Sequence, residues 1–221
     1  SLRAVTGEGD RQYLTGLNMG GRHILVLLDA STSMLDQTIV NIIRRRNLSP
    51  AEQRSSEKWQ RGLKTVEWIT ANMPATARFQ IVTFAEAATA VDQTSDGRWL
   101  SAETPQALEN ALNQLADLTP NGGSNLHAAF GAIENLDPLP DNVFLITDGL
   151  PTQGVRPAKG SLVSARDRLQ HFTDALTTLN LTVPINVILL PMEGDPVASP
   201  SFWRLAQITG GAFLSPARDW P

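Results

Sequence analysis

Short apolar runs alternate with longer amphipathic stretches along this chain. A run such as 24–28, bounded by polar or turn residues, is typical of a strand buried on both faces of a parallel sheet. The pattern predicts strands at 23–28, 79–84, 142–147 and 184–190, with short ones at 87–91 and 212–214.

The stretches between the strands repeat apolar residues at three- and four-residue intervals, which is the period of an amphipathic helix. Helices are predicted at 35–46, 50–73, 105–118, 125–136, 162–180 and 202–209. The second has the clearest start, because Ser49 can cap it, Pro50 suits its first position and Glu52 completes a capping box.

Strands that alternate with helices predict an α/β fold. We expect a doubly wound, Rossmann-like, mostly parallel sheet with helices on both faces and one short antiparallel edge strand. Residues 1–21 form a polar lead-in with Tyr13, Leu14 and Leu17 as apolar anchors. One domain follows at 22–215, with an insertion at 35–56, and 216–221 form a tail.

Composition narrows the choice of partners. The chain has 221 residues, 42% of them hydrophobic, and a net charge of −4, with 15 arginines and 3 lysines that are scattered. This balance argues against nucleic acid as a partner, and the run 44–46 is interpreted as a solvated helix end. No apolar run is long enough to span a bilayer. The chain starts with Ser1, so we expect a fragment whose membrane tether would lie outside it.

Oxygen-bearing side chains gather where predicted strands end. Asp29, Ser31 and Ser33 follow the first strand, Asp148 follows the strand at 142–147, and Ser124 closes a glycine-rich loop. The carboxyl ends of parallel strands share one edge of a sheet, so these groups should converge. Hard cations such as Mg²⁺ prefer oxygen ligands of this kind. The alternative is that the first three merely cap a helix.

The three segments, Asp29-Ala30-Ser31-Thr32-Ser33, Gly122-Gly123-Ser124 and Thr147-Asp148-Gly149, together resemble the metal-ion-dependent adhesion site of bacterial von Willebrand factor A domains. The resemblance covers about 22–214. It implies metal ligands Asp29, Ser31, Ser33, Ser124 and Asp148, with Mg²⁺ or Mn²⁺ favoured over Ca²⁺. Ser124 departs from the family's Thr, so we expect a somewhat weaker or more mobile site.

The resemblance also implies a function and a location. Such domains bind a partner protein through an Asp or Glu carboxylate that completes the coordination of the metal, without catalysis. A bacterial domain of this type is often tethered to a membrane, so we expect a membrane-anchored or extracytoplasmic location.

Two other functions stay open. The first is a Mg²⁺-dependent hydrolase or phosphotransfer enzyme with Asp29 as nucleophile. Such an enzyme usually needs a second acid, where Ser31 stands, and a lysine for the phosphate, and the only lysines are Lys58, Lys64 and Lys159. The second is a scaffold that works without metal. Turnover that requires Mg²⁺ would distinguish the enzyme from the binding module.

Several segments should surround this edge. The insertion at 35–56 could be a docking element or extra core, and we favour core packing for its isoleucines, Ile39, Ile42 and Ile43, while leaving the arginines open. Loops 150–161, with Arg156 and Lys159, and 191–200, with Glu193 and Asp195, should rise around the metal. The histidines, His23, His127 and His171, are dispersed, so no zinc site is expected.

Overall fold

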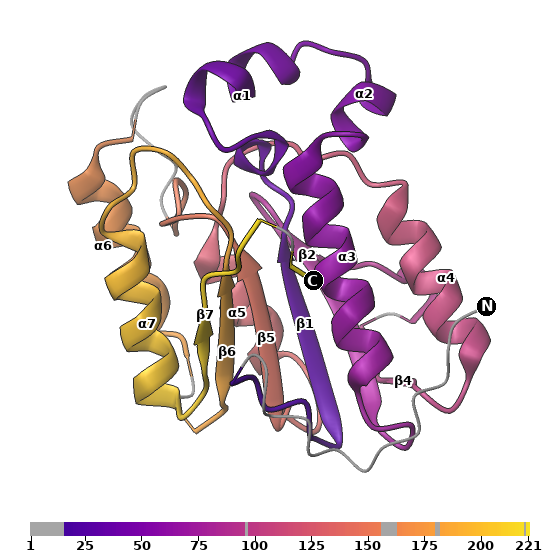
Figure 1. Cartoon of the computed structure of the whole chain (residues 1–221). Coiled ribbons are helices and arrows are strands. Elements are labelled where there is room, and N and C mark those ends of the chain that lie inside the picture. Colours follow the sequence, from indigo (N-terminus) through magenta and orange to yellow (C-terminus); the bar gives the residue numbers. More distant parts are fainter. Residues whose placement is uncertain (1–15, 96, 156–162, 180–181, 219) are drawn as a thin grey trace.

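The structure is a computed structural model that describes residues 16–95, 97–155, 163–179, 182–218 and 220–221. One sheet runs through the molecule in the order β3-β2-β1-β5-β6-β7, and β4 also pairs with β2 (Figure 1). The strands are β1 (His23–Asp29), β2 (Arg78–Phe84), β3 (Ala88–Ala90), β4 (Leu100–Ser101), β5 (Asn142–Thr147), β6 (Ile185–Leu189) and β7 (Phe213–Leu214). The predicted strands are confirmed; β4, only two residues long, was missed.

The pairing of the strands confirms the predicted fold class. β2, β1, β5, β6 and β7 are parallel, whereas β3 and β4 pair antiparallel with β2 at the edge. All of β5, and β1 after its first residue, are buried. Because β1 and β5 are neighbours at the centre, the segments that follow them emerge side by side.

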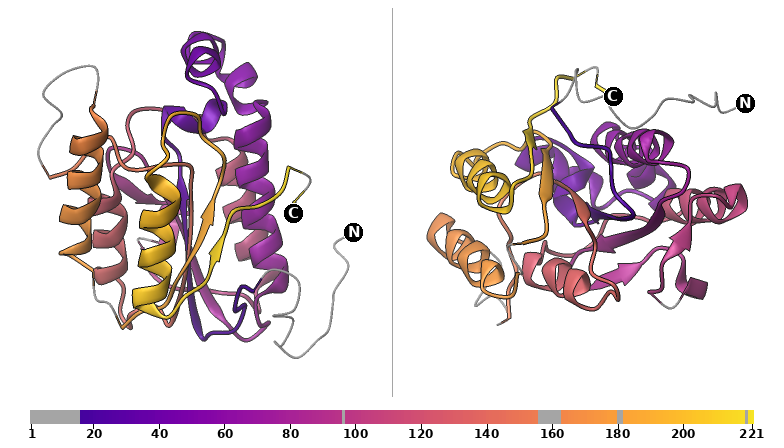
Figure 2. Two further views of the ribbon diagram at one scale, coloured as in Figure 1. Left: turned by 60° about the vertical axis from the view of Figure 1, so that its left-hand side comes forward. Right: turned by 90° about the horizontal axis from the view of Figure 1, so that it is seen from below.

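The helices cover both faces of the sheet (Figure 2). One apolar cluster joins α3 and α4 to one face, and the other joins α5, α6 and α7 to the opposite face. The helices are η1 (Thr32–Leu35), α1 (Ile39–Arg45), α2 (Pro50–Arg54), α3 (Glu57–Asn72), η2 (Gln93–Ser95), α4 (Pro105–Ala116), α5 (Leu126–Glu134), α6 (Ala165–Leu176) and α7 (Ala198–Thr209). α7 begins four residues before the predicted start, because Pro200 is tolerated within its first turn.

The predicted helix at 35–46 is confirmed only from Ile39 onward, and its predicted start is wrong. The chain forms the short 3₁₀ helix η1, turns at Asp36 and only then begins α1. The Asp36 carboxylate accepts the backbone N–H groups of Gln37 and Thr38, which offers these groups an alternative to helical bonds.

The expected core packing of the isoleucines is also wrong. α1 has no buried residue, and Ile39 and Ile43 are 50% and 47% exposed. Helical spacing predicted that these side chains share a face, but no helix or strand in the described part of the chain buries that face. In Figure 1, α1 and α2 stand above the carboxyl end of β1, beside the start of α3.

The predicted helix at 50–73 is two helices. The Ser49 capping box is confirmed, but α2 ends at Arg54 and α3 begins at Glu57, because Ser56 has an extended backbone. The predicted apolar stripe of α3 is buried. Of the lead-in anchors, Leu17 is buried, whereas Tyr13 and Leu14 lie outside the described residues. No helix in the described ranges combines the length and apolar character needed to cross a bilayer.

Candidate metal centre

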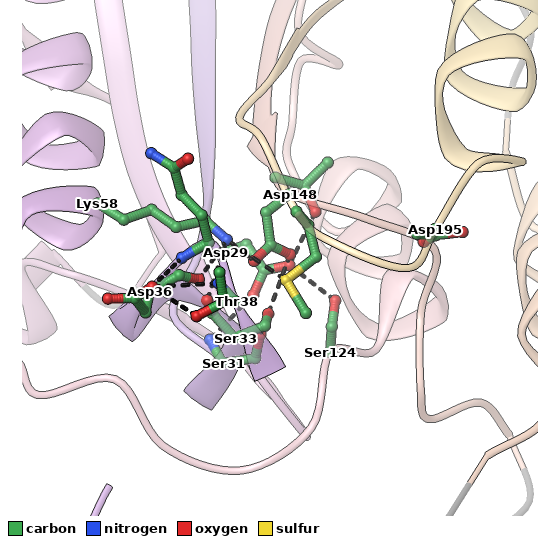
Figure 3. A network of polar contacts seen from close by, with 12 residues as sticks. Asp29, Ser31, Ser33, Asp36, Thr38, Lys58, Ser124, Asp148 and Asp195 are labelled. Carbon is green, nitrogen blue, oxygen red and sulfur yellow. Dashed lines mark hydrogen bonds and ion pairs between the residues drawn. The ribbon is translucent and has the colours of Figure 1, made fainter. Parts of the chain in front are cut away.

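The five oxygen-bearing residues singled out from the sequence lie together at the carboxyl edge of the sheet (Figure 3). Asp29 ends β1, and Asp148 directly follows β5. Ser31 directly precedes η1, Ser33 lies within it, and Ser124 directly precedes the N-cap residue of α5. The central position of β1 and β5 brings the three segments into contact.

Asp29 is fully buried and both of its carboxylate oxygens accept hydrogen bonds. Oδ1 accepts the backbone N–H of Ser31 at 2.9 Å. Oδ2 accepts the hydroxyls of Ser124 and Thr147, each at 2.8 Å. Burial, and then the charge of Asp148, raise the pKa of Asp29 to about 6 from its ordinary 3.8, although the bonds from Ser31 and Ser124 oppose the shift.

The hydroxyls of Ser31 and Ser33 lie 3.0 Å apart, and Ser33 Oγ donates to Asp148 Oδ1 at 2.9 Å. Ser31 makes no side-chain cap to η1, so its hydroxyl is turned toward the cluster and not toward the helix end. This orientation weighs against the capping alternative.

Ser124 is held through its backbone as well as through its bond to Asp29. Its carbonyl accepts the N–H groups of Thr152 and Gln153, and its own N–H donates to the Thr152 hydroxyl at 3.1 Å. Gly122, two residues before Ser124, has a φ of +73°, which glycine adopts without strain. The carbonyl of Gly122 accepts the Thr32 N–H at 3.0 Å. The loop is thus tied to the turn that carries Ser31 and Ser33. An open cavity of about 450 Å³ adjoins this side of the site and is lined partly by Ala30, Glu86 and Gly122.

Lys58 also belongs to the cluster, and the sequence reasoning missed its place there. Its ammonium, at the start of α3, donates to Asp148 Oδ2 at 2.6 Å. It also donates to the carbonyls of Ser33 at 3.0 Å and Asp36 at 2.9 Å. The position of Lys58 in the sequence could have revealed its place, because helices that follow parallel strands start at the carboxyl edge of the sheet. The prediction of one helix over 50–73 concealed this, because it placed Lys58 in the middle of a helix and not near its start.

The surrounding loops have structural tasks. Asp195 pairs with Arg168 at 2.7 Å and accepts the Leu150 N–H, so it holds the loop after β6 to the segment after β5. The Glu193 carboxylate accepts the Ile39 N–H at 3.4 Å, which joins the same loop to α1. Arg156 and Lys159 lie outside the described residues.

The donor set fits a small, hard cation. In an octahedral Mg²⁺ site with bonds of about 2.1 Å, neighbouring oxygens lie roughly 3 Å apart, which is the spacing of the Ser31 and Ser33 hydroxyls. In the described ranges, no group of three or more His, Cys, Asp or Glu side chains could hold a metal. The two carboxylates and the Lys58 ammonium leave one negative charge, and the hydroxyls are neutral.

The pKa of Asp29 gives a pH prediction for the protein in chelator. Since the folded pKa of about 6 lies above the ordinary 3.8, the folded state holds this proton more tightly. The contribution of the Asp29 proton to the free energy of unfolding is therefore fully present below about pH 4, and it is lost as the pH rises through about 6. Urea unfolding should show the wild type losing stability over this interval relative to Asp29→Asn, which mimics the protonated acid. A difference that stays constant with pH would contradict the assignment.

Known proteins from bacteria and from an animal have similar structures. A von Willebrand factor type A protein from Catenulispora acidiphila matches over 90% of this chain and 39% of its own length, with 16% identity and a TM-score of 0.59. The PilB minor pilin from Streptococcus sanguinis matches over 90% of this chain and 58% of its own, with 13% identity and a TM-score of 0.54.

Mussel byssus proximal thread matrix protein 1, in a structure with a zinc-occupied metal-ion-dependent adhesion motif, matches over 89% of this chain and 43% of its own, with 15% identity and a TM-score of 0.51. The chain therefore spans about two fifths to three fifths of these proteins. No protein-family model and no curated sequence matches it. The likeness in structure shows that the chain has the von Willebrand factor A fold.

Proposed function

We propose that this chain is a non-catalytic, metal-dependent protein-binding module. A divalent cation held by Asp29, Ser31, Ser33, Ser124 and Asp148 would bind an acidic residue of a partner protein. The observation that carries the proposal is the convergence of five oxygen-bearing side chains from three segments, each of them within hydrogen-bond distance of at least one of the others.

The charge of the site favours this function. Mg²⁺, or Mn²⁺ in its place, would meet two carboxylates, of which Asp148 is already paired with Lys58. The cation therefore keeps uncompensated positive charge, and a carboxylate from a partner supplies the missing negative charge. Ca²⁺ is less suited, because it prefers more oxygens and a roomier site.

The partner would also meet α1, whose solvent-exposed side chains extend this surface. Ile39, Val40 and Ile43 are between 47% and 58% exposed, and Arg44 and Arg46 are exposed beside them. Arg45 is paired with Asp36 at 3.0 Å and fixes α1 to the turn after η1. An acidic segment with apolar side chains complements both the arginines and the cation, so the docking role considered for the insertion is the one we adopt.

One observation favours the rival phosphotransfer enzyme: a lysine does lie in the site. The arrangement nevertheless suits that chemistry poorly. Asp29, the nucleophile such an enzyme would use, has no exposed surface and both its oxygens accept hydrogen bonds. Lys58 is bound to Asp148 and to two carbonyls, and has no N–H left for a phosphate. Release of phosphate from acetyl phosphate that requires Mg²⁺ and Asp29 would support the enzyme.

We also propose that the domain lies on the outer side of a bacterial membrane, anchored by segments outside this chain. Its structural similarity to a minor pilin supports this location. A fusion of the native gene to a reporter active only outside the cytoplasm tests it.

The experiment for the proposed function is affinity capture from the source organism in Mg²⁺ and in chelator. We expect a partner that is retained in Mg²⁺, released by chelator and absent with Asp29→Ala. Asp117→Ala, which changes an exposed aspartate directly after α4, is the matched control and should behave as wild type. Capture that is equal in chelator and with Asp29→Ala would favour the metal-free scaffold.

The same assay tests α1 through the double variant Ile39→Ser/Ile43→Ser. Because both side chains are half exposed, the melting temperature should stay near that of the wild type. Capture of the Mg²⁺-dependent partner should fall at least about tenfold, as loss of well-packed contacts typically does. Unchanged capture would remove α1 from the interface and leave the metal function intact.

A further inference from the structure

Lys58 places its ammonium group against one of the candidate metal ligands. Its side chain is 2% exposed, and its ammonium lies 2.6 Å from Asp148 Oδ2. A buried lysine is rare unless it is paired. Nothing in the proposed coordination by carboxylates and hydroxyls requires it.

The ammonium is fixed in place by a complete set of acceptors. Its three N–H donors meet three oxygens: Asp148 Oδ2 and the carbonyls of Ser33 and Asp36. The Met192 sulfur lies 3.7 Å away. Figure 3 shows the lysine reaching from α3 to the turn after β1, so it ties that turn to Asp148.

The two oxygens of Asp148 consequently have different tasks. Oδ2 is taken by Lys58, whereas Oδ1 faces the Ser33 hydroxyl and the rest of the cluster. A cation among the hydroxyls would use Oδ1 and would share the carboxylate with the ammonium. Sharing lowers the electrostatic benefit that the cation gains from that carboxylate, and the two positive charges repel each other in a site that is largely shielded from water.

We propose that Lys58 is a positioning residue that fixes Asp148 and, through its charge, holds the affinity of the empty site for a divalent cation low. The inference rests on the proposed metal function. This role has a regulatory consequence. The carboxylate of an arriving partner replaces the negative charge of Asp148 that Lys58 neutralises. The metal and the partner therefore each bind more tightly when the other is present.

The test uses Mn²⁺ alone, with free Mn²⁺ measured by electron paramagnetic resonance. Lys58→Met and Lys58→Gln should each bind Mn²⁺ at least about tenfold more tightly than the wild type, because both remove the repelling charge. Lys58→Arg keeps the charge and should bind no more tightly than the wild type. Lys64→Met, on the exposed side of the same helix, is the matched control and should change the affinity less than about twofold.

The possible outcomes distinguish the role of Lys58 from the proposed metal-binding function on which it rests. If the neutral variants bind Mn²⁺ as the wild type does, or more weakly, while Asp29→Ala abolishes binding, the role of Lys58 is overturned and the metal site stands. If no protein binds Mn²⁺, both fail. Lys58→Gln keeps amide donors for the two carbonyls, so it provides the comparison if Lys58→Met does not fold.

Discussion

Asp29→Ala should abolish the stabilisation of this protein by metal. A cation that binds only the folded state adds about 2.7 kcal/mol at a hundredfold excess over its Kd. For a domain of this size, that corresponds to a rise of roughly 5–10 °C in melting temperature. Asp29 lies at the centre of the cluster, joined to Ser31 and Ser124, so its loss removes a charged ligand and the acceptor that orients a hydroxyl.

Thermal melts followed by circular dichroism in Mg²⁺, Mn²⁺ and chelator measure this effect. The wild type and Asp117→Ala should both gain stability with either metal, and Asp29→Ala should melt at one temperature in all three conditions. A wild type that melts equally in chelator and in millimolar metal would count against an occupied site. Metal stabilisation that survives in a folded Asp29→Ala would show that the ligand assignment is wrong.

Asp148→Ala should be the most destabilising change at the site, even in chelator. It leaves the Lys58 ammonium buried without its carboxylate, and breaking a buried ion pair in this way costs about 3–5 kcal/mol. Adding Lys58→Met should recover much of the loss, because the second change removes the stranded charge. Urea unfolding of the two single variants and the double variant measures the coupling.

Glu57, which is next to Lys58 in the sequence, supplies the control for this experiment. Glu57 pairs with Arg218 at 3.3 Å, but both side chains are largely exposed, so Glu57→Ala should leave the unfolding midpoint close to that of the wild type. If Asp148→Ala proved as mild as Glu57→Ala, the buried pair would not hold the turn to the sheet. If the double variant were no more stable than Asp148→Ala, the cost would come from the lost carboxylate itself.

The sequence was most informative where one physical rule governs the result. Between their polar end residues, β1 and β5 are apolar because both faces of the sheet are covered, so their bounds are nearly those predicted. Parallel strands share a carboxyl edge, so Asp29 and Asp148 had to emerge on the same side. The Ser49 capping box is a local arrangement within four residues and is visible in the sequence for that reason.

The predictions failed where two arrangements share one local pattern. Helical spacing put Ile39 and Ile43 on one face but carried no information on whether another element covers that face. The turn at Asp36, stabilised by its own carboxylate, turns α1 away from the core. Likewise, the apolar stripe of α3 gave no sign that the chain breaks at Ser56.

The sequence by itself determined the α/β fold and the five oxygen-bearing side chains at one edge of the sheet, because buried strands and their alternation with helices are visible in the residue pattern. Only the tertiary structure decided that Lys58 pairs with Asp148 across 90 residues and that α1 stays exposed. Both outcomes depend on which distant segments meet after packing, and a buried charge is stable only where such a meeting provides its partner.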